Sequence, residues 1–207
     1  MRPIVYSVCS LGLAALVLPA TASAWSPFRA ESPKVKRGNE LMAEKQYEAA
    51  LEAYDEAAEE LPNARGIQLN RGLALLAQDL TEPSKEAFMA AADPSAPADT
   101  RADAYYDLGI AYAREGEALS QQDSYGEASA HFREAADAFK GALRLRPGDR
   151  NAAWNLEYVM KRIREEQEKQ GQEQQQEQQQ EQEQQQEQQQ GQEQGQEQGQ
   201  EQEQEQE

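Results

Sequence analysis

The sequence has few histidine and cysteine residues with which to carry out nucleophilic catalysis or hold a metal. His131 is the only histidine, and it stands between Ala130 and Phe132 in a stretch of helix-forming residues. Cys9 is the only cysteine and lies in an apolar N-terminal run. Nucleophilic catalysis needs a Ser or Cys with a positioned base, and zinc needs several nitrogen and sulfur ligands. We therefore predict no catalytic residue, no metal site and no cofactor, and interpret His131 as a surface or packing residue.

Acidic residues and glycines are plentiful, but their arrangement points to no chemistry. The formal net charge is −18, and paired carboxylates are the usual pattern of solvated helix faces. The glycines match neither G-x-x-x-x-G-K nor G-x-G-x-x-G, the spacings that cradle phosphates. The one basic cluster, Lys161, Arg162 and Arg164, is short. We predict no nucleic-acid partner and no small-molecule ligand.

The N-terminus has the features of a secretory signal. Arg2 precedes an apolar run, residues 4–18, which is followed by Pro19 and the sequence Ala-Ser-Ala. We predict a signal peptide over residues 1–24, cleaved between Ala24 and Trp25, and a linker over 25–33. The protein would then be exported to the periplasm. The alternative is an uncleaved signal that anchors the chain in the inner membrane.

An internal repeat organises the middle of the chain. Residues of the same kind recur 34 positions apart, namely Gly38 and Gly72, Tyr54 and Phe88, and Ala57 and Ala91. Within each unit the apolar residues recur at helical spacing, with small residues where two helices would approach. The pattern predicts two helical hairpins, over about 31–64 and 65–98.

A third hairpin is predicted to be longer than the first two. Tyr105, Gly109 and Tyr112 fit its first helix, while Phe132 and Phe139 fit its second only if fourteen residues are inserted. Shared between antiparallel helices, that is seven residues each, or about two turns, so facing residues stay in phase. The tip would lie near residues 121–124. A floppy loop is the alternative. After residue 147 a further helix would cap the stack.

Residues 170–207 contain only Gln, Glu and Gly. Such a segment cannot bury enough apolar surface to offset its conformational entropy, so we predict a disordered low-complexity tail. Gln and Glu also favour helix, which leaves open a fraying helix that continues from the cap.

The hairpins resemble those of the tetratricopeptide-repeat (TPR) family, with a small residue at the eighth position, an aromatic at the twenty-fourth and Ala at the twenty-seventh. The resemblance implies an all-α solenoid over residues 34–169, with about three repeats and a C-terminal capping helix. In that family the first helix of each hairpin lines a groove for a partner peptide. The corresponding residues here are Val35, Asn39, Leu69, Asn70, Leu73, Tyr106, Ile110, Trp154 and Tyr158. Several of them could instead pack between helices.

Chaperone-binding members of the TPR family hold a C-terminal carboxylate in a clamp of Lys, Asn and Arg. Asn39 and Asn70 match the clamp asparagines, but Val35, Asp103 and Asp107 stand where positive charge would be expected. We therefore do not predict carboxylate capture.

The signal, the repeats, the string from Asn151 to Glu157 and the polar tail together resemble the small TPR proteins of bacterial Bat aerotolerance operons. That resemblance implies a periplasmic scaffold that accompanies von Willebrand factor A proteins and a MoxR-type ATPase. A TPR subunit of outer-membrane or cell-wall assembly machinery is the alternative. An enzyme accessory module is disfavoured, because the tail offers no catalytic module.

Overall fold

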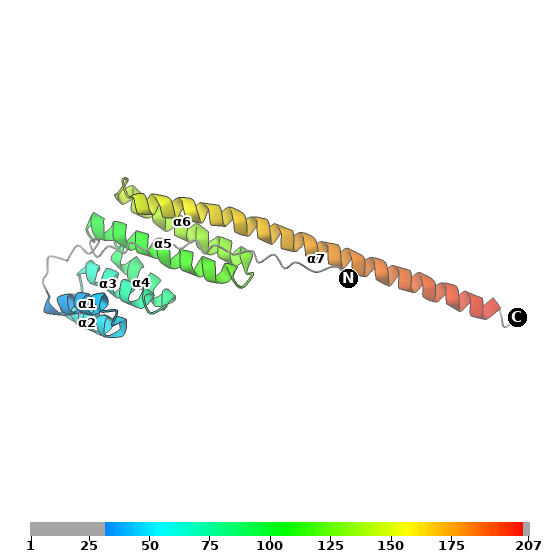
Figure 1. Cartoon of the computed structure of the whole chain (residues 1–207), viewed down its shortest axis with the longest axis horizontal. Helices are drawn as coiled ribbons and strands as arrows, with labels where there is room; N and C mark the ends of the chain where they lie inside the picture. The colour runs from blue at the N-terminus through cyan, green and yellow to red at the C-terminus, as the bar shows by residue number, and fades with distance from the viewer. Residues whose placement is uncertain (1–31, 205–207) are drawn as a thin grey trace, which may run out of the picture.

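The computed structural model describes residues 32–204, and these residues form seven α-helices and no strand (Figure 1). The predicted signal peptide, its cleavage site between Ala24 and Trp25, and most of the predicted linker lie outside the described residues. The helices are α1 (Pro33–Ala43), α2 (Tyr47–Glu60), α3 (Arg65–Leu76), α4 (Thr81–Ala91), α5 (Ala98–Ser120), α6 (Tyr125–Leu145) and α7 (Arg150–Gln204).

Consecutive helices pair into three hairpins, α1 with α2, α3 with α4 and α5 with α6, which stack side by side (Figure 1). The turn inside each hairpin contains one non-glycine residue in the left-handed region: Lys45 at φ 61°, Asp79 at φ 59° and Asp123 at φ 59°. The same backbone conformation therefore reverses the chain in all three hairpins, and the repeat seen in the sequence is a repeat of local structure.

A glycine against an aromatic ring is the central contact of every hairpin. Gly38 lies against the buried ring of Tyr54, and Gly72 against that of Phe88. A Cβ at Gly109 would come within 2.7 Å of the Phe139 ring, closer than carbon atoms can approach. The first helix of each hairpin therefore needs glycine at this position, because the ring fills the space of a side chain.

The third hairpin contains this contact twice. Its helices have 23 and 21 residues, and a Cβ at Gly116 would lie 2.9 Å from the ring of Phe132. Gly116 follows Gly109 by seven residues, and Phe132 precedes Phe139 by seven. Because seven residues make about two turns, the added length repeats the same packing instead of disrupting it. The turn lies at residues 121–124, and the floppy-loop alternative is wrong.

Helix α7 covers the third hairpin and carries no partner helix of its own. It begins where the Asp149 carboxylate accepts hydrogen bonds from the backbone N–H groups of Asn151 and Ala152, each at 3.0 Å. Val159 and Ile163 then enter the core that the third hairpin forms. This apolar stripe makes α7 the cap of the solenoid.

A cluster of charged side chains holds α7 against the tip of the third hairpin. Glu166 is fully buried and lies 3.1 Å from Arg162 Nη2 and 2.9 Å from Lys169 Nζ. Arg162 also bonds both carboxylate oxygens of Glu117 on α5, at 2.9 and 3.1 Å. Removing one partner of a buried pair leaves an uncompensated charge, so this cluster is strongly coupled to the position of α7.

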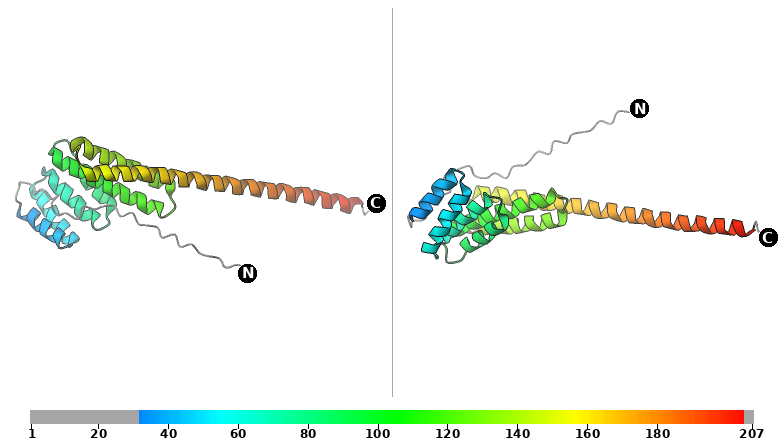
Figure 2. Two further views of the ribbon diagram at one scale, coloured as in Figure 1. Left: turned by 45° about the horizontal axis from the view of Figure 1, so that its top comes forward. Right: turned by 90° about the horizontal axis from the view of Figure 1, so that it is seen from below.

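Beyond the solenoid α7 continues as a single helix to Gln204, where a disordered tail was expected (Figure 2). The physical reason is the high helix propensity of Gln and Glu, which lets the helix started by the cap propagate without a new nucleus. The side chains of residues 172–180 are exposed, so packing contributes nothing there. The segment from Gly171 to Gln204 would extend about 50 Å at 1.5 Å per residue.

None of the helices within residues 32–204 combines the length and the apolar character that a membrane crossing requires.

The glycine contact is tested by comparing Gly109→Val with Gly171→Val. The first substitution places a side chain into the Phe139 ring and is expected to lower the free energy of unfolding by about 1–3 kcal/mol, as overpacking does. A Cβ at Gly171 would meet no atom within 4 Å, so the second substitution is the matched control in a helix. Urea unfolding measures both, and equal midpoints would contradict the packing assigned to Gly109.

Deleting the chain after Gln170 is expected to leave the urea midpoint nearly unchanged, because the side chains of residues 172–180 are exposed. The deletion keeps Gln170, whose side chain lies beside Gly126 on α6. A large loss of stability would show instead that the tail packs on the solenoid.

Candidate partner-binding groove

The first helices of the three hairpins and the cap, α1, α3, α5 and α7, present the residues that the sequence assigned to a groove. Aligned on their glycines, α1, α3 and α5 place Val35, Leu69 and Tyr106 at one position, and the cap adds Trp154 in the same series. Val35 and Tyr106 are buried, Leu69 is half-buried, and Trp154 is 45% exposed. The most exposed member of the row therefore lies on α7.

At the other end, the two asparagines meet. The Tyr54 hydroxyl donates to Asn39 Oδ1 at 2.8 Å, and Asn70 Nδ2 donates to the same oxygen at 3.4 Å. The structure thus brings Asn39 and Asn70 together across α1 and α3. Their hydrogen bond ties the first two hairpins to each other.

The apolar members of the predicted set divide into two groups. Val35 and Ile110 are 6% and 1% exposed, so they pack in the core and offer a partner almost no surface. Leu69 and Leu73 are half-buried and lie against the main core. For Val35 and Ile110 the packing alternative is the correct one.

The aromatic residues at the α5–α7 end form a connected group. Asn155 Nδ2 donates to the Tyr106 hydroxyl at 3.0 Å, and the Tyr106 ring lies 5.8 Å from that of Phe139. The rings of Trp154 and Tyr158 are stacked, with centroids 5.8 Å apart and planes within 6°. The Tyr158 hydroxyl donates to Glu117, which holds this stack in place. An open hollow of about 290 Å³ lies here, lined by Arg150, Asn151, Trp154 and Asn155.

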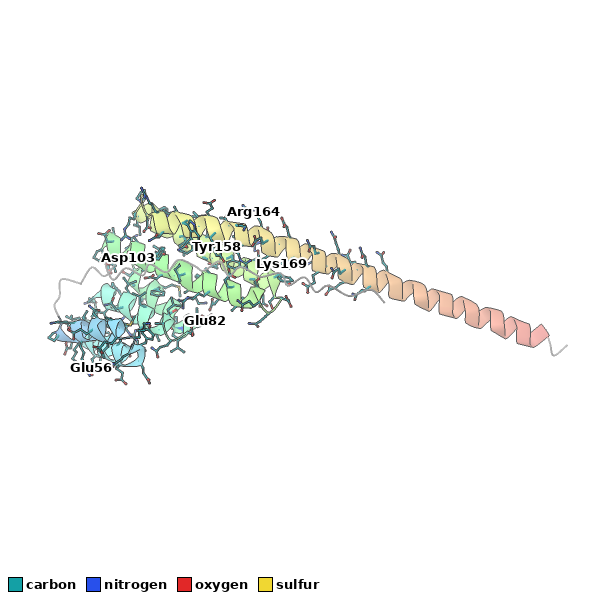
Figure 3. All side chains as sticks on the ribbon, in the orientation of Figure 1. Glu56, Glu82, Asp103, Tyr158, Arg164 and Lys169 are labelled. Atoms are coloured by element: carbon teal, nitrogen blue, oxygen red, sulfur yellow. The ribbon has the colours of Figure 1, made fainter. Side chains whose placement is uncertain are left out.

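Aspartates line the neighbouring face of α5. Arg146 Nη1 lies 2.7 Å from Asp103 and 3.4 Å from Asp149, and its Nη2 lies 3.6 Å from Asp99 (Figure 3 labels Asp103). Asp107 follows Asp103 by one helical turn and makes no ion pair with any side chain that the structure describes. Burial, with a smaller contribution from the Asp103 charge, raises the pKa of Asp107 to about 8. Burial likewise raises the pKa of Asp103.

Sequence reasoning does not select Asp107 and Asn155 as site residues. Asp107 stands out only because it lacks the positive charge of a carboxylate clamp, and Asn155 only as part of the string that opens the last helix. The available signal is positional: Asn70, Asp107 and Asn155 occupy the same place in α3, α5 and α7. That place faces the preceding first helix, as the bonds from Asn70 to Asn39 and from Asn155 to Tyr106 demonstrate.

His131 belongs to a separate cluster. Its Nδ1 lies 3.1 Å from Glu115 Oε2, which is also 2.6 Å from the buried ammonium of Lys85. Glu82 completes the cluster at 2.7 Å from Lys85. These contacts join the second hairpin to the third. Within residues 32–204, the described side chains provide no group of three or more His, Cys, Asp or Glu able to hold a metal ion.

No family model matches the chain, and no curated protein matches it in sequence. Solved structures do match. The first TPR domain of the human RPAP3 protein superimposes with a TM-score of 0.53 at 16% identity, covering 65% of this chain and 93% of that one. The second TPR domain of human RPAP3, solved with the HSP70 peptide SGPTIEEVD, gives 0.50 at 23% identity, covering 61% and 92%. The Arabidopsis OM64 TPR domain gives 0.50 at 22%, covering 62% and 93%.

The fold is that of a TPR solenoid. At these identities the likeness establishes the architecture, and it leaves the choice of partner to the residues of this groove. The covered share of this chain is close to that of α1 to α7 without the extended helix. The TPR arrangement of hairpins predicted from the 34-residue period is confirmed.

The raised pKa of Asp107 predicts a pH-dependent stability. A carboxyl group whose pKa rises from about 4 when unfolded to about 8 when folded loses stability as pH rises across that interval. Asp107→Asn should therefore become more stable than the wild type as pH goes from 4 to 8, by ~2 kcal/mol, since partial contact with water reduces the full linkage value. Urea unfolding between pH 4 and 9 measures this. Asp137→Asn, an exposed change on α6, is the control; parallel pH profiles for wild type and Asp107→Asn would contradict the prediction.

Proposed function

We propose that the protein is an exported, non-catalytic TPR adaptor that holds partner proteins at the α5–α7 end of its groove. The single observation that carries this proposal is the stacked pair Trp154 and Tyr158 beside an open hollow. A tryptophan that is 45% exposed offers an apolar ring face for a partner to cover, and aromatic residues are common energetic anchors of interfaces.

The fold supports the same class of function. TPR domains with this architecture include one solved with a bound HSP70 peptide, so the solenoid is able to present a peptide-binding surface. That peptide ends in Glu-Glu-Val-Asp, whereas the groove here carries aspartates and has only the two asparagines of a carboxylate clamp. A partner of this chain is therefore expected to differ in charge from that peptide.

The compartment is part of the proposal. The basic residue, apolar run and Ala-Ser-Ala sequence at the N-terminus favour export to the periplasm, with an uncleaved inner-membrane anchor as the alternative. In that compartment we propose a scaffold of the Bat aerotolerance type, acting with von Willebrand factor A proteins. The resemblance in the string from Asn151 to Glu157 gains interest because those residues include Trp154 and Asn155 of the groove.

A subunit of outer-membrane or cell-wall assembly machinery is the second candidate. It would use the same fold, groove and compartment, so the partner's identity separates the two. The long helix beyond Gln170 is compatible with either role, because a helix of about 50 Å can hold the solenoid away from a surface or from another protein.

The test is crosslinking and affinity purification of the native protein from envelope fractions, with partners identified by mass spectrometry. Trp154→Ala should reduce partner recovery by about tenfold or more, as removal of an interface anchor does. Met89→Ala on α4, a residue 51% exposed, is the matched control and should leave recovery unchanged.

The partners recovered with the wild type and lost with Trp154→Ala decide the assignment. Von Willebrand factor A proteins would support the aerotolerance scaffold. Outer-membrane assembly proteins or cell-wall enzymes would move the assignment to envelope assembly. If no partner depends on Trp154, the adaptor proposal is wrong.

A further inference from the structure

The groove contains hydrogen-bond acceptors that the described part of the protein does not match with donors. Asp107 is the first: it is half-buried on α5 and has no ion-pair partner among the described side chains. A carboxylate in this position costs stability, and natural sequences retain such groups where a ligand uses them.

Asn155 is the second unmatched acceptor, and it is independent of the first because it lies on another helix. Its side chain is 1% exposed, and it lines the open hollow beside Arg150, Asn151 and Trp154. Its Nδ2 donates to the Tyr106 hydroxyl, but its buried Oδ1 has no hydrogen-bond partner within the described residues. A buried amide oxygen left in this state favours a ligand that brings an N–H donor.

The charge around the two acceptors is negative. Asp99, Asp103 and Asp149 surround Arg146, and Asp107 follows Asp103 by one helical turn on α5. Arg146 is already bonded to three of those aspartates, and Arg150 is exposed at the start of α7. The surrounding charges therefore stabilise a positively charged group that enters here and destabilise a carboxylate.

The stacked rings of Trp154 and Tyr158 add a preference for one kind of cation. An exposed tryptophan face attracts cations, and a planar guanidinium can stack on it while its five N–H groups donate sideways. A compact ammonium group would satisfy a carboxylate but could not stack in this way. Arginine therefore suits the surroundings better than lysine.

We propose that the α5–α7 end of the groove binds a basic segment of a partner protein, whose arginine side chains pair with Asp107 and stack on Trp154. Asn155 Oδ1 accepts a hydrogen bond from the same segment. This inference rests on the proposed adaptor function and names the chemistry of its partner. It also assigns the groove the opposite charge preference to a carboxylate clamp.

The pKa of Asp107 supports this assignment. Burial raises that pKa to about 8 in the free protein, and an arriving guanidinium lowers it again, which favours release of the proton and formation of the ion pair. The unfavourable desolvation of the carboxylate is then offset by the partner's charge.

The test uses the full chain and a peptide series with one backbone, derived from the acidic sequence SGPTIEEVD. The basic probe is fluorescein-labelled SGPTIRRVR amide, and its matched control carries citrulline at every arginine, which keeps the shape and removes the charge. A lysine version separates stacking from charge. Fluorescence anisotropy at about 150 mM salt limits general attraction to the acidic chain.

The basic peptide is expected to bind about tenfold or more tightly than the citrulline peptide, with the lysine peptide between them and the acidic peptide weakest. Asp107→Asn should remove most of the difference between arginine and citrulline. Asp137→Asn makes the same substitution at an exposed site on α6 and should preserve the difference. Circular dichroism of each variant establishes that the helices are retained.

Two outcomes would overturn the inference: equal binding of the arginine and citrulline peptides, or equal effects of Asp107→Asn and Asp137→Asn. If either occurs while Trp154→Ala still removes envelope partners, the adaptor function stands and the charge preference is wrong. If the arginine peptide binds through Asp107 but no envelope partner depends on Trp154, the site stands and the adaptor function is wrong.

Discussion

The contact between a glycine and an aromatic ring sets how closely the two helices of every hairpin approach. Each hairpin closes only because a ring on its second helix occupies the space that a side chain on its first helix would need. This close approach fixes the distance and register of the two helices. The third hairpin uses the contact twice, at Gly109 and at Gly116, and so gains two turns per helix without changing how it packs. The seven-residue spacing of the two contacts keeps the added turns of both helices in phase.

The two ends of the solenoid differ in how fully their polar groups are paired. The α1–α3 end satisfies its polar groups internally, since Asn39 accepts from both Tyr54 and Asn70. The α5–α7 end leaves Asp107 without an ion pair and Asn155 Oδ1 without a donor among the described residues. Folding alone would favour replacing such groups, which agrees with the partner-binding role proposed for the α5–α7 end.

The sequence predicted the hairpins well because their period, their glycines and their rings are local signals that repeat. It also predicted the length and the turn of the third hairpin, since helical phase permits few ways to add fourteen residues. It did not reveal that Glu166, which pairs with Arg162, is fully buried. It could not single out Asp107 or Asn155, because their importance lies in which neighbours are missing, and that depends on packing between helices far apart in sequence.

Helix α7 belongs to both the solenoid and the tail, with no flexible linker between them. The charged cluster around Glu166 sets the rotation of this helix about its own axis where it leaves the third hairpin. Since an α-helix turns by about 100° per residue, each residue added to the helix beyond Gln170 rotates its backbone by that angle relative to the groove. The length of the tail helix therefore determines both how far its far end lies from the groove and the direction in which that end faces.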